Sequence, residues 1–181
     1  MARRILGITG PPGAGKTTYA ERLVAEAQVP AAHLPMDGFH LADVALRSLG
    51  LLYRKGAPET FDARGYAALL ARVRTANDTV WAPGFERDLE QPLAGAIAIE
   101  PEAELVVTEG NYLLSRKGGW SPVAGLLDEA WYLDIDPATR RDRLVRRHED
   151  HGKTHVEAEA WTDGSDEANA ALIAATRGGA R

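Results

Sequence analysis

The sequence predicts an α/β fold in three layers, with helices on both faces of a mainly parallel, doubly wound sheet and a hairpin at its periphery. Two observations lead to this prediction. Strand-like apolar runs alternate with helical patterns, which is typical of a parallel sheet built from strand–helix–strand units. The first such run, residues 4–9, is followed directly by a glycine-rich pattern at residues 10–17. A length of 181 residues suits one domain, so we expect a single domain over residues 1–181.

The first half of the chain is expected to supply two strands and three helices. After the strand at residues 4–9, apolar side chains from Tyr19 to Ala27 recur at helical spacing. Asp62 is a good N-cap for a later helix, because its carboxylate can accept a hydrogen bond from a free backbone N–H of the first turn. The expected elements are a helix at 16–28, a strand at 31–36, a helix at 41–49, a loop at 50–60 and a helix at 63–75.

The second half is expected to supply the hairpin and two more strands. Residues 105–108 are fully apolar, which favours a central strand buried on both faces. Pro137 suits the first position of a helix, where its missing N–H costs no hydrogen bond. The expected elements are hairpin arms at 79–83 and 96–99 joined by a charged loop at 85–92, the strand at 105–108, a strand at 130–135, a basic helix at 137–148 and a final helix at 166–176.

Residues 10–17 match the phosphate-binding loop pattern G-x-x-x-x-G-K-[ST]. Its glycines let successive backbone N–H groups turn inward around phosphate oxygens. Lys16 can then reach the β- and γ-phosphates, and the Thr17 hydroxyl can ligate Mg²⁺. A plain glycine-rich turn between strand and helix is the alternative. We expect a nucleoside triphosphate site formed by Gly10, Pro11, Pro12, Gly13, Ala14, Gly15, Lys16 and Thr17.

Acidic residues follow two of the later strands. In doubly wound sheets ligands bind at the carboxyl ends of the strands, so Asp37 and Glu109 should face the phosphate site. Asp37 is the candidate general base, on the expectation that its strand lies beside the first strand; the alternative is a turn-forming Asp-Gly pair. Glu109 ends the most apolar strand, where Mg²⁺ or its water shell would compensate the charge; the alternative is a solvated strand end.

The basic helix carries five arginines within residues 140–147. Arg140, Arg143 and Arg147 fall on one face at i, i+3 and i+7, so they can close over a triphosphate and stabilise charge that develops during phosphoryl transfer. The alternative is a solvated basic face. His148, His151 and His155 also suggest a metal site, but they lie among charges at a helix end, and we expect none there.

Composition narrows the class of protein. The net charge is −5 and the pI is about 5.6, which argues against a broad surface for nucleic acid or membranes. The chain has no cysteine, which excludes disulfides, thiolate catalysis and zinc–thiolate sites. No apolar run suits a signal peptide or a membrane span, so a soluble cytoplasmic protein is expected.

Five motifs together resemble the phosphoribulokinase, uridine kinase and pantothenate kinase group of P-loop kinases. They are Gly10 to Thr18, Met36-Asp37-Gly38-Phe39-His40, Pro58-Glu59-Thr60-Phe61-Asp62, Val107-Thr108-Glu109-Gly110-Asn111-Tyr112 and the arginines of 140–148. With the late run Asp166-Glu167-Ala168-Asn169, the chain is most similar to a bacterial branch described as nucleoside/nucleotide kinase-like or fructose-transport-system kinase.

The resemblance implies the three-layer P-loop kinase fold, with a lid helix at about 137–152, and a role for each motif. Asp37 would be the base, and Lys16 and the lid arginines would contact phosphates, including Arg140 and Arg143 in nucleotide binding. Thr17 and Glu109 would face Mg²⁺. Residues near the acceptor would be Asp37, His40, Arg54, Phe61, Asp62, Arg87 and Glu109.

We therefore expect an ATP-dependent, Mg²⁺-requiring kinase that phosphorylates a hydroxyl of a small metabolite, with a sugar or nucleoside as the expected acceptor. A pantothenate-like acceptor is an alternative, although the long insertions of pantothenate kinases are absent. A GTP-dependent switch is disfavoured because no N-K-x-D pattern occurs. A regulatory nucleotide-binding protein stays open. The chain ends where relatives continue into another strand, so a homodimer partner at a bare sheet edge is a further expectation.

Overall fold

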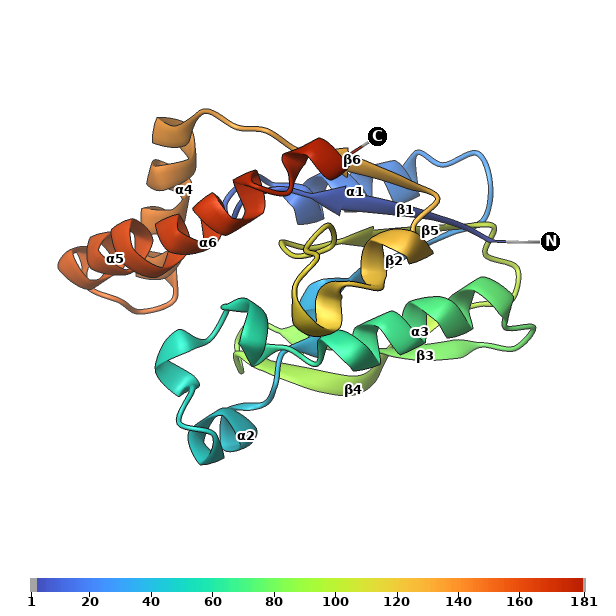
Figure 1. The fold of residues 1–181 in the computed structure, drawn as a ribbon, viewed down its shortest axis with the longest axis horizontal. Helices are drawn as coiled ribbons and strands as arrows, with labels where there is room; N and C mark the ends of the chain where they lie inside the picture. The colour runs from blue at the N-terminus through green and yellow to red at the C-terminus, as the bar shows by residue number, and fades with distance from the viewer. Residues whose placement is uncertain (1–2, 181) are drawn as a thin grey trace.

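The computed structural model describes residues 3–180 as a four-stranded parallel sheet, helices on its two faces and a separate two-stranded hairpin (Figure 1). The predicted three-layer α/β fold is confirmed. The strands are β1 (Arg4–Thr9), β2 (Ala31–Pro35), β3 (Val80–Glu86), β4 (Gln91–Ile99), β5 (Leu105–Glu109) and β6 (Glu129–Tyr132). The α-helices are α1 (Lys16–Ala25), α2 (Asp43–Ser48), α3 (Ala63–Thr75), α4 (Pro137–Asp150), α5 (His155–Trp161) and α6 (Glu167–Ala174).

The strand order in the sheet is β2-β5-β1-β6, and all neighbours are parallel. The expectation that the second strand lies beside the first was wrong, because β5 lies between them. The last four residues of β5 are buried, because neighbouring strands pair with both of its edges and packed segments cover both of its faces. The prediction that β5 is central is confirmed.

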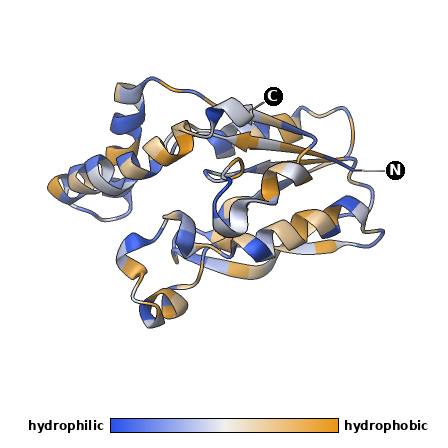
Figure 2. Cartoon of the chain, in the orientation of Figure 1, coloured by the Kyte–Doolittle hydropathy of each residue, from blue (hydrophilic) through white to orange (hydrophobic). Residues whose placement is uncertain are grey.

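Each face of the sheet packs against its own helices. On one face Ile8 and Val107 pack with Ala20 of α1. On the other face a larger cluster joins the sheet to α3, the hairpin and the segment 112–127, with Tyr66 of α3 fully buried. Figure 2 shows the resulting contrast: the central strands are mostly hydrophobic, whereas α4 is mostly hydrophilic. The core is therefore built around the sheet, and α4 lies at its margin.

The hairpin is longer than the sequence predicted. Strands β3 and β4 pair as far as Glu86 and Gln91, so the turn is only residues 87–90. The segment 85–92 was expected to be a charged loop, but its four outer residues belong to the strands and only 87–90 form the turn. The expected loop was therefore too long at both ends, although the charged residues Arg87, Asp88 and Glu90 do lie in the turn.

The region after β6 contains one more helix than expected. Helix α4 begins at Pro137, as predicted, and Asp136 caps it. Helix α5 was missed, although Thr154 and Glu157 form a capping box at its start. A single π-helical turn over 162–166 then joins α5 to α6. Within residues 3–180 no helix is long and apolar enough to cross a membrane.

Candidate active site

The phosphate loop joins β1 to α1, and its glycines have the backbone geometry that the pattern requires. Gly13 and Gly15 have φ angles of +79° and +85°, which side chains other than glycine rarely adopt. At Gly10 a Cβ would lie 2.5 Å from the Leu133 carbonyl oxygen. Helix α1 begins at Lys16, so its free N-terminal amides and the positive end of its dipole face the loop. This geometry fits a bound phosphate chain.

Lys16 is buried beneath this loop. Its Nζ donates a hydrogen bond to the Pro11 carbonyl oxygen at 3.0 Å. Burial lowers the pKa of Lys16 to about 8, although the negative charges of Glu109 and Asp37 act in the opposite direction; Arg147 lowers this pKa further. Lys16, Glu109 and Asp37 therefore form one charge cluster, with Arg147 within electrostatic reach.

Thr17 at the end of the phosphate loop lies beside Glu109 at the end of β5. The Thr17 hydroxyl donates to Glu109 Oε1 at 2.9 Å. Burial, with repulsion from Asp37, raises the pKa of Glu109 to about 7, whereas Lys16 and the Thr17 hydrogen bond lower it. A hydroxyl and a carboxylate beside a phosphate loop are the hard oxygen ligands that Mg²⁺ accepts together with phosphate and water. The pair therefore fits the expected magnesium site.

Asp37 follows β2 in a short 3₁₀ turn, and its side chain is about one-third exposed, at 32%. Its Oδ2 lies 3.8 Å from Nη2 of Arg87 in the hairpin turn. Its charge also acts on Lys16 and Glu109. Although β5 separates β2 from β1, the carboxylate still faces the phosphate side, because all three strands end at the same edge.

Two of the other residues predicted near the acceptor lie beside Asp37. The His40 ring lies 3.9 Å from Phe61 and 4.9 Å from Phe85, measured between ring centroids. Its Nδ1 is 2.9 Å from the Asp37 carbonyl oxygen, and burial lowers the pKa of His40 below its usual value. The structure thus brings together Asp37, His40, Phe61 and Arg87. Phe85 was missed, because it was assigned to the charged loop.

Arg54 and Asp62 have other partners. Arg54 forms an ion pair with Glu59 at the surface. Asp62 caps α3, as predicted, by accepting a hydrogen bond from the Gly65 backbone N–H at 2.8 Å. Capping engages one carboxylate oxygen of Asp62, and the role of Arg54 and Asp62 near the acceptor stays a prediction.

The three lid arginines do not share one environment, contrary to the expectation from their spacing. Arg140 is buried and pairs with Glu167 of α6. Arg143 and Arg147 are exposed, and Nη1 of Arg143 lies 3.7 Å from the Cβ position of Gly15. Because α4 also contacts α6, the side of α4 that carries Arg140 is covered by α6. Arg143 and Arg147 therefore face the phosphate loop, while Arg140 is held between that loop and α6.

The three histidines have separate partners. His148 Nε2 lies 2.7 Å from Asp166 Oδ2, and His155 Nδ1 lies 2.7 Å from Glu149 Oε1. His151 Nδ1 lies 2.6 Å from the Arg147 carbonyl oxygen. They stabilise the lid region, and they do not converge on one point.

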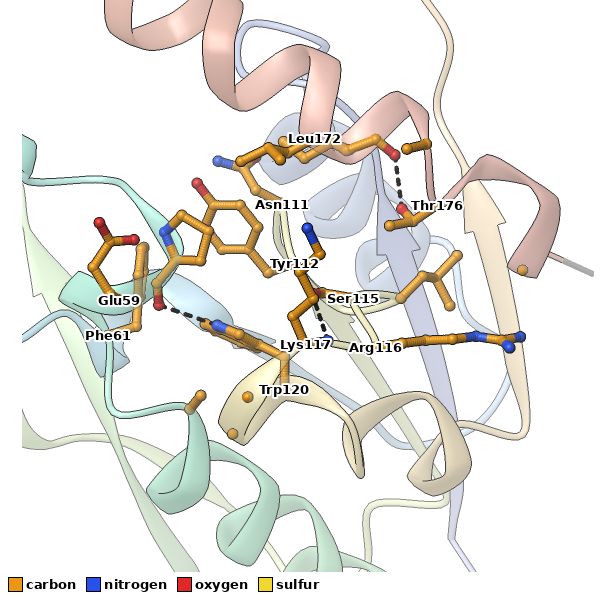
Figure 3. A pocket seen from close by; sticks show the side chains of 18 of the residues that line it. Glu59, Phe61, Asn111, Tyr112, Ser115, Arg116, Lys117, Trp120, Leu172 and Thr176 are labelled. Carbon is orange, nitrogen blue, oxygen red and sulfur yellow. Dashed lines mark hydrogen bonds between the residues drawn. The ribbon is translucent and has the colours of Figure 1, made fainter.

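A cavity of about 880 Å³, which was not predicted from the sequence, adjoins the acceptor side of the site (Figure 3). Phe61, Tyr112 and Trp120 form aromatic walls, and Leu172 of α6 lies opposite. The Tyr112 hydroxyl donates to the Gly56 carbonyl oxygen at 2.6 Å, and Trp120 Nε1 donates to the Pro58 carbonyl oxygen at 3.1 Å. Both rings are thus fixed with their polar atoms satisfied, and a ligand would meet mainly their apolar faces.

Several known proteins share the fold and much of the sequence of this chain, although no family model matches it. The crystal structure of a "putative fructose transport system kinase" from Silicibacter sp. TM1040 superposes with a TM-score of 0.90 at 41% identity, covering 97% of this chain and 86% of that one. A "putative uridine kinase" of Schizosaccharomyces pombe is 31% identical over 189 residues, covering 94% of this chain and 78% of that protein.

A third relative, the ATP-dependent kinase-like protein notR' of Aspergillus versicolor, is 37% identical over 121 residues, covering 62% of this chain and 70% of that protein. On the fold that it shares with the Silicibacter protein, this chain carries the phosphate loop, an acidic residue after β2, another at the end of β5 and the arginine-rich helix α4. The chain therefore belongs to the P-loop kinases, in the group that includes the uridine kinases, pantothenate kinases and phosphoribulokinases.

Proposed function

We propose that this P-loop kinase transfers the γ-phosphoryl group of ATP to a hydroxyl of a sugar, a nucleoside or a similar small metabolite. The observation that carries the proposal is the charge cluster at the ends of β1, β2 and β5. The negative charges of Glu109 and Asp37 act on Lys16, and the charges of Lys16 and Asp37 act on Glu109, beside a loop shaped for phosphate. Such a set supplies a cation for the phosphates, a ligand for Mg²⁺ and a carboxylate for the attacking hydroxyl.

On this proposal the phosphate loop binds the triphosphate, and Lys16 exchanges its bond to the Pro11 carbonyl for phosphate oxygens. Thr17 and Glu109 would hold Mg²⁺, which when bound neutralises charge on the β- and γ-oxygens. Arg143 and Arg147 would stabilise the charge that spreads over the transferring group. The interior position of Lys16 strengthens its effect, because fewer water molecules screen the charge.

Asp37 would accept the proton of the acceptor hydroxyl as its oxygen attacks the γ-phosphorus and the bond to the β-phosphate oxygen breaks. Arg87, with Nη2 3.8 Å from the Asp37 carboxylate, is placed to orient that carboxylate. His40 and Phe61 would position the acceptor, since Phe61 faces both His40 and the 880 Å³ cavity. The cavity offers space for the part of the acceptor that does not react.

The experiment is a transfer assay with ATP, Mg²⁺ and a panel of sugars, nucleosides and pantothenate-like vitamin precursors. Once an acceptor is found, Asp37→Asn and Asp37→Ala are compared with the unmodified protein. We expect ATP to bind normally and transfer to fall by about 10² to 10⁴ in Asp37→Asn. Equal losses in both variants indicate a missing base, whereas a much larger loss in Asp37→Ala indicates that the side chain also positions the hydroxyl.

Two results would contradict the proposal. Unchanged transfer in Asp37→Asn would remove Asp37 as the base. Tight ATP binding without turnover on any acceptor would favour the regulatory nucleotide-binding alternative instead.

A further inference from the structure

The run Asp166-Glu167-Ala168-Asn169 has no role in the site described so far. It begins at the end of the π-helical turn, and its two acids both contact the lid helix α4. Asp166 pairs with His148, and Glu167 pairs with Arg140. Single π-helical turns inside helices are frequent at functional sites, because the extra residue changes the direction of the side chains that follow. The contact between Glu167 and Arg140 is the one that reaches the phosphate loop.

Arg140 is packed directly against that loop. A Cβ at Gly13 would lie 3.3 Å from Cγ of Arg140 and 3.2 Å from its carbonyl oxygen. The residue is only 6% exposed, which is unusual for an arginine. The Arg140 side chain therefore runs from the phosphate loop, where its Cγ packs at Gly13, to Glu167 of α6, which pairs with its guanidinium. Glycine at position 13 is what allows this close approach.

The guanidinium is only partly satisfied. Nη2 is paired with the Glu167 carboxylate, whereas Nη1 is buried and has no hydrogen-bond partner within residues 3–180. A buried donor without a partner is destabilising, and an anionic oxygen would relieve this cost. Arg143 and Arg147 differ, because they are exposed and form no ion pair within the same residues. Only Arg140 among these three is oriented by a carboxylate.

We propose that Glu167 is a positioning residue for nucleotide binding: it orients the guanidinium of Arg140, whose Cγ packs at Gly13, so that Nη1 is available to a phosphate oxygen of ATP. The carboxylate takes one nitrogen and leaves the other free, which fixes the direction of the planar group. The proposal rests on the proposed function, since it requires that the phosphate loop binds ATP. It also gives the run 166–169 a purpose, because the same run ties α6 to the lid helix through Asp166.

Glu167→Gln tests the proposal, with Glu159→Gln as the matched control. Glu159 also pairs with an arginine of α4, Arg141, but that pair does not contact the phosphate loop. We expect Glu167→Gln to weaken Mg·ATP binding by about three- to ten-fold. This is the effect expected from losing the charge-assisted hydrogen bond between Glu167 and Arg140, which is partly exposed to water. Glu159→Gln should bind Mg·ATP like the unmodified protein. Thermal melting without nucleotide should be similar in both variants, since both carboxylates are at least 40% exposed.

A double-mutant cycle shows whether Glu167 acts through Arg140. In an Arg140→Lys background the Glu167→Gln change should cause little further loss of affinity, because its target is gone. Additive losses, or an equal effect of Glu159→Gln, would overturn the proposal. Tighter ATP binding in Glu167→Gln would also overturn it, since Glu167 would then be withholding Arg140 from the phosphates. If Arg140→Lys fails to fold, the comparison of the two glutamate variants still decides.

These measurements use binding alone and need no acceptor. A failure to find turnover therefore counts against the proposed function, while the effect of Glu167→Gln on Mg·ATP affinity decides the role of Glu167 separately.

Discussion

Replacing Glu109 by glutamine should make the nucleotide-free protein more stable at pH 8 while removing the carboxylate proposed to bind magnesium. Glu109 is 3% exposed at the end of the central strand, where an ionised carboxylate is poorly solvated. Glutamine has nearly the same shape and can still accept the hydrogen bond from the Thr17 hydroxyl. The substitution therefore removes the charge with little change in packing.

The magnitude follows from the raised pKa of Glu109. A rise from 4.5 to about 7 corresponds to roughly 3 kcal/mol, because each pKa unit is worth about 1.4 kcal/mol. The folded state holds this proton more tightly than the unfolded state, so stability is full below pH 4.5 and falls as the pH rises to about 7. Part of the gain in the variant is offset, because Lys16 loses a favourable neighbour. We expect Glu109→Gln to be more stable by about 1 to 3 kcal/mol at pH 8.

The assay is urea denaturation of the nucleotide-free protein at pH 5 and pH 8, with Glu104→Gln as the control, since Glu104 is exposed. The difference in unfolding free energy between Glu109→Gln and the unmodified protein should be small at pH 5 and large at pH 8. Glu104→Gln should show no such pH-dependent difference. A Glu109→Gln protein that is equally or less stable at pH 8 would refute the reasoning, and it would mean that the carboxylate is well compensated even without metal.

Three further predictions concern the phosphate loop and the lid. Lys16→Ala should abolish transfer, because the lysine is expected to neutralise charge on the phosphates. It should not lower the melting temperature, because the substitution removes a buried amino group whose pKa is already depressed to about 8. Near-normal turnover would exclude the ATP-kinase mechanism. Arg147→Gln should lower kcat more than it weakens ATP binding, which steady-state kinetics and calorimetry measure; if neither changes, this arginine is only a solvated surface group. Gly13→Ala should impair both folding stability and ATP binding, because position 13 has a φ of +79° and the added Cβ would lie 2.9 Å from Cγ of Leu144. A variant with unchanged melting temperature and ATP affinity would show that α4 can move away.

Much of the site could be predicted from the sequence because its chemistry is local. The glycines, Lys16 and Thr17 lie within one short loop whose spacing has a direct geometric meaning. Asp37 and Glu109 were found because each ends an apolar strand, and parallel strands end at one edge of a sheet. Their roles in catalysis and metal binding stay predictions.

Contacts between distant segments could not be predicted in the same way. The sequence placed Arg140 with the other lid arginines, but packing against α6 buries it and pairs it with Glu167, 27 positions later. It placed β2 beside β1, because nothing local encodes which neighbour a strand takes. It also gave no sign of the cavity, whose walls come from three separate parts of the chain.

The sequence by itself determined the fold class, the phosphate loop and the acidic residues that face it, since each depends on periodicity or spacing over a few residues. The tertiary structure alone decided the strand order, the electrostatic coupling of Lys16 with Glu109, and the division of the lid arginines into exposed and buried members. These features depend on burial, and burial is set by which segments exclude water from one another. Burial raises the pKa of Glu109, and it leaves Nη1 of Arg140 without a partner among the residues that the structure describes.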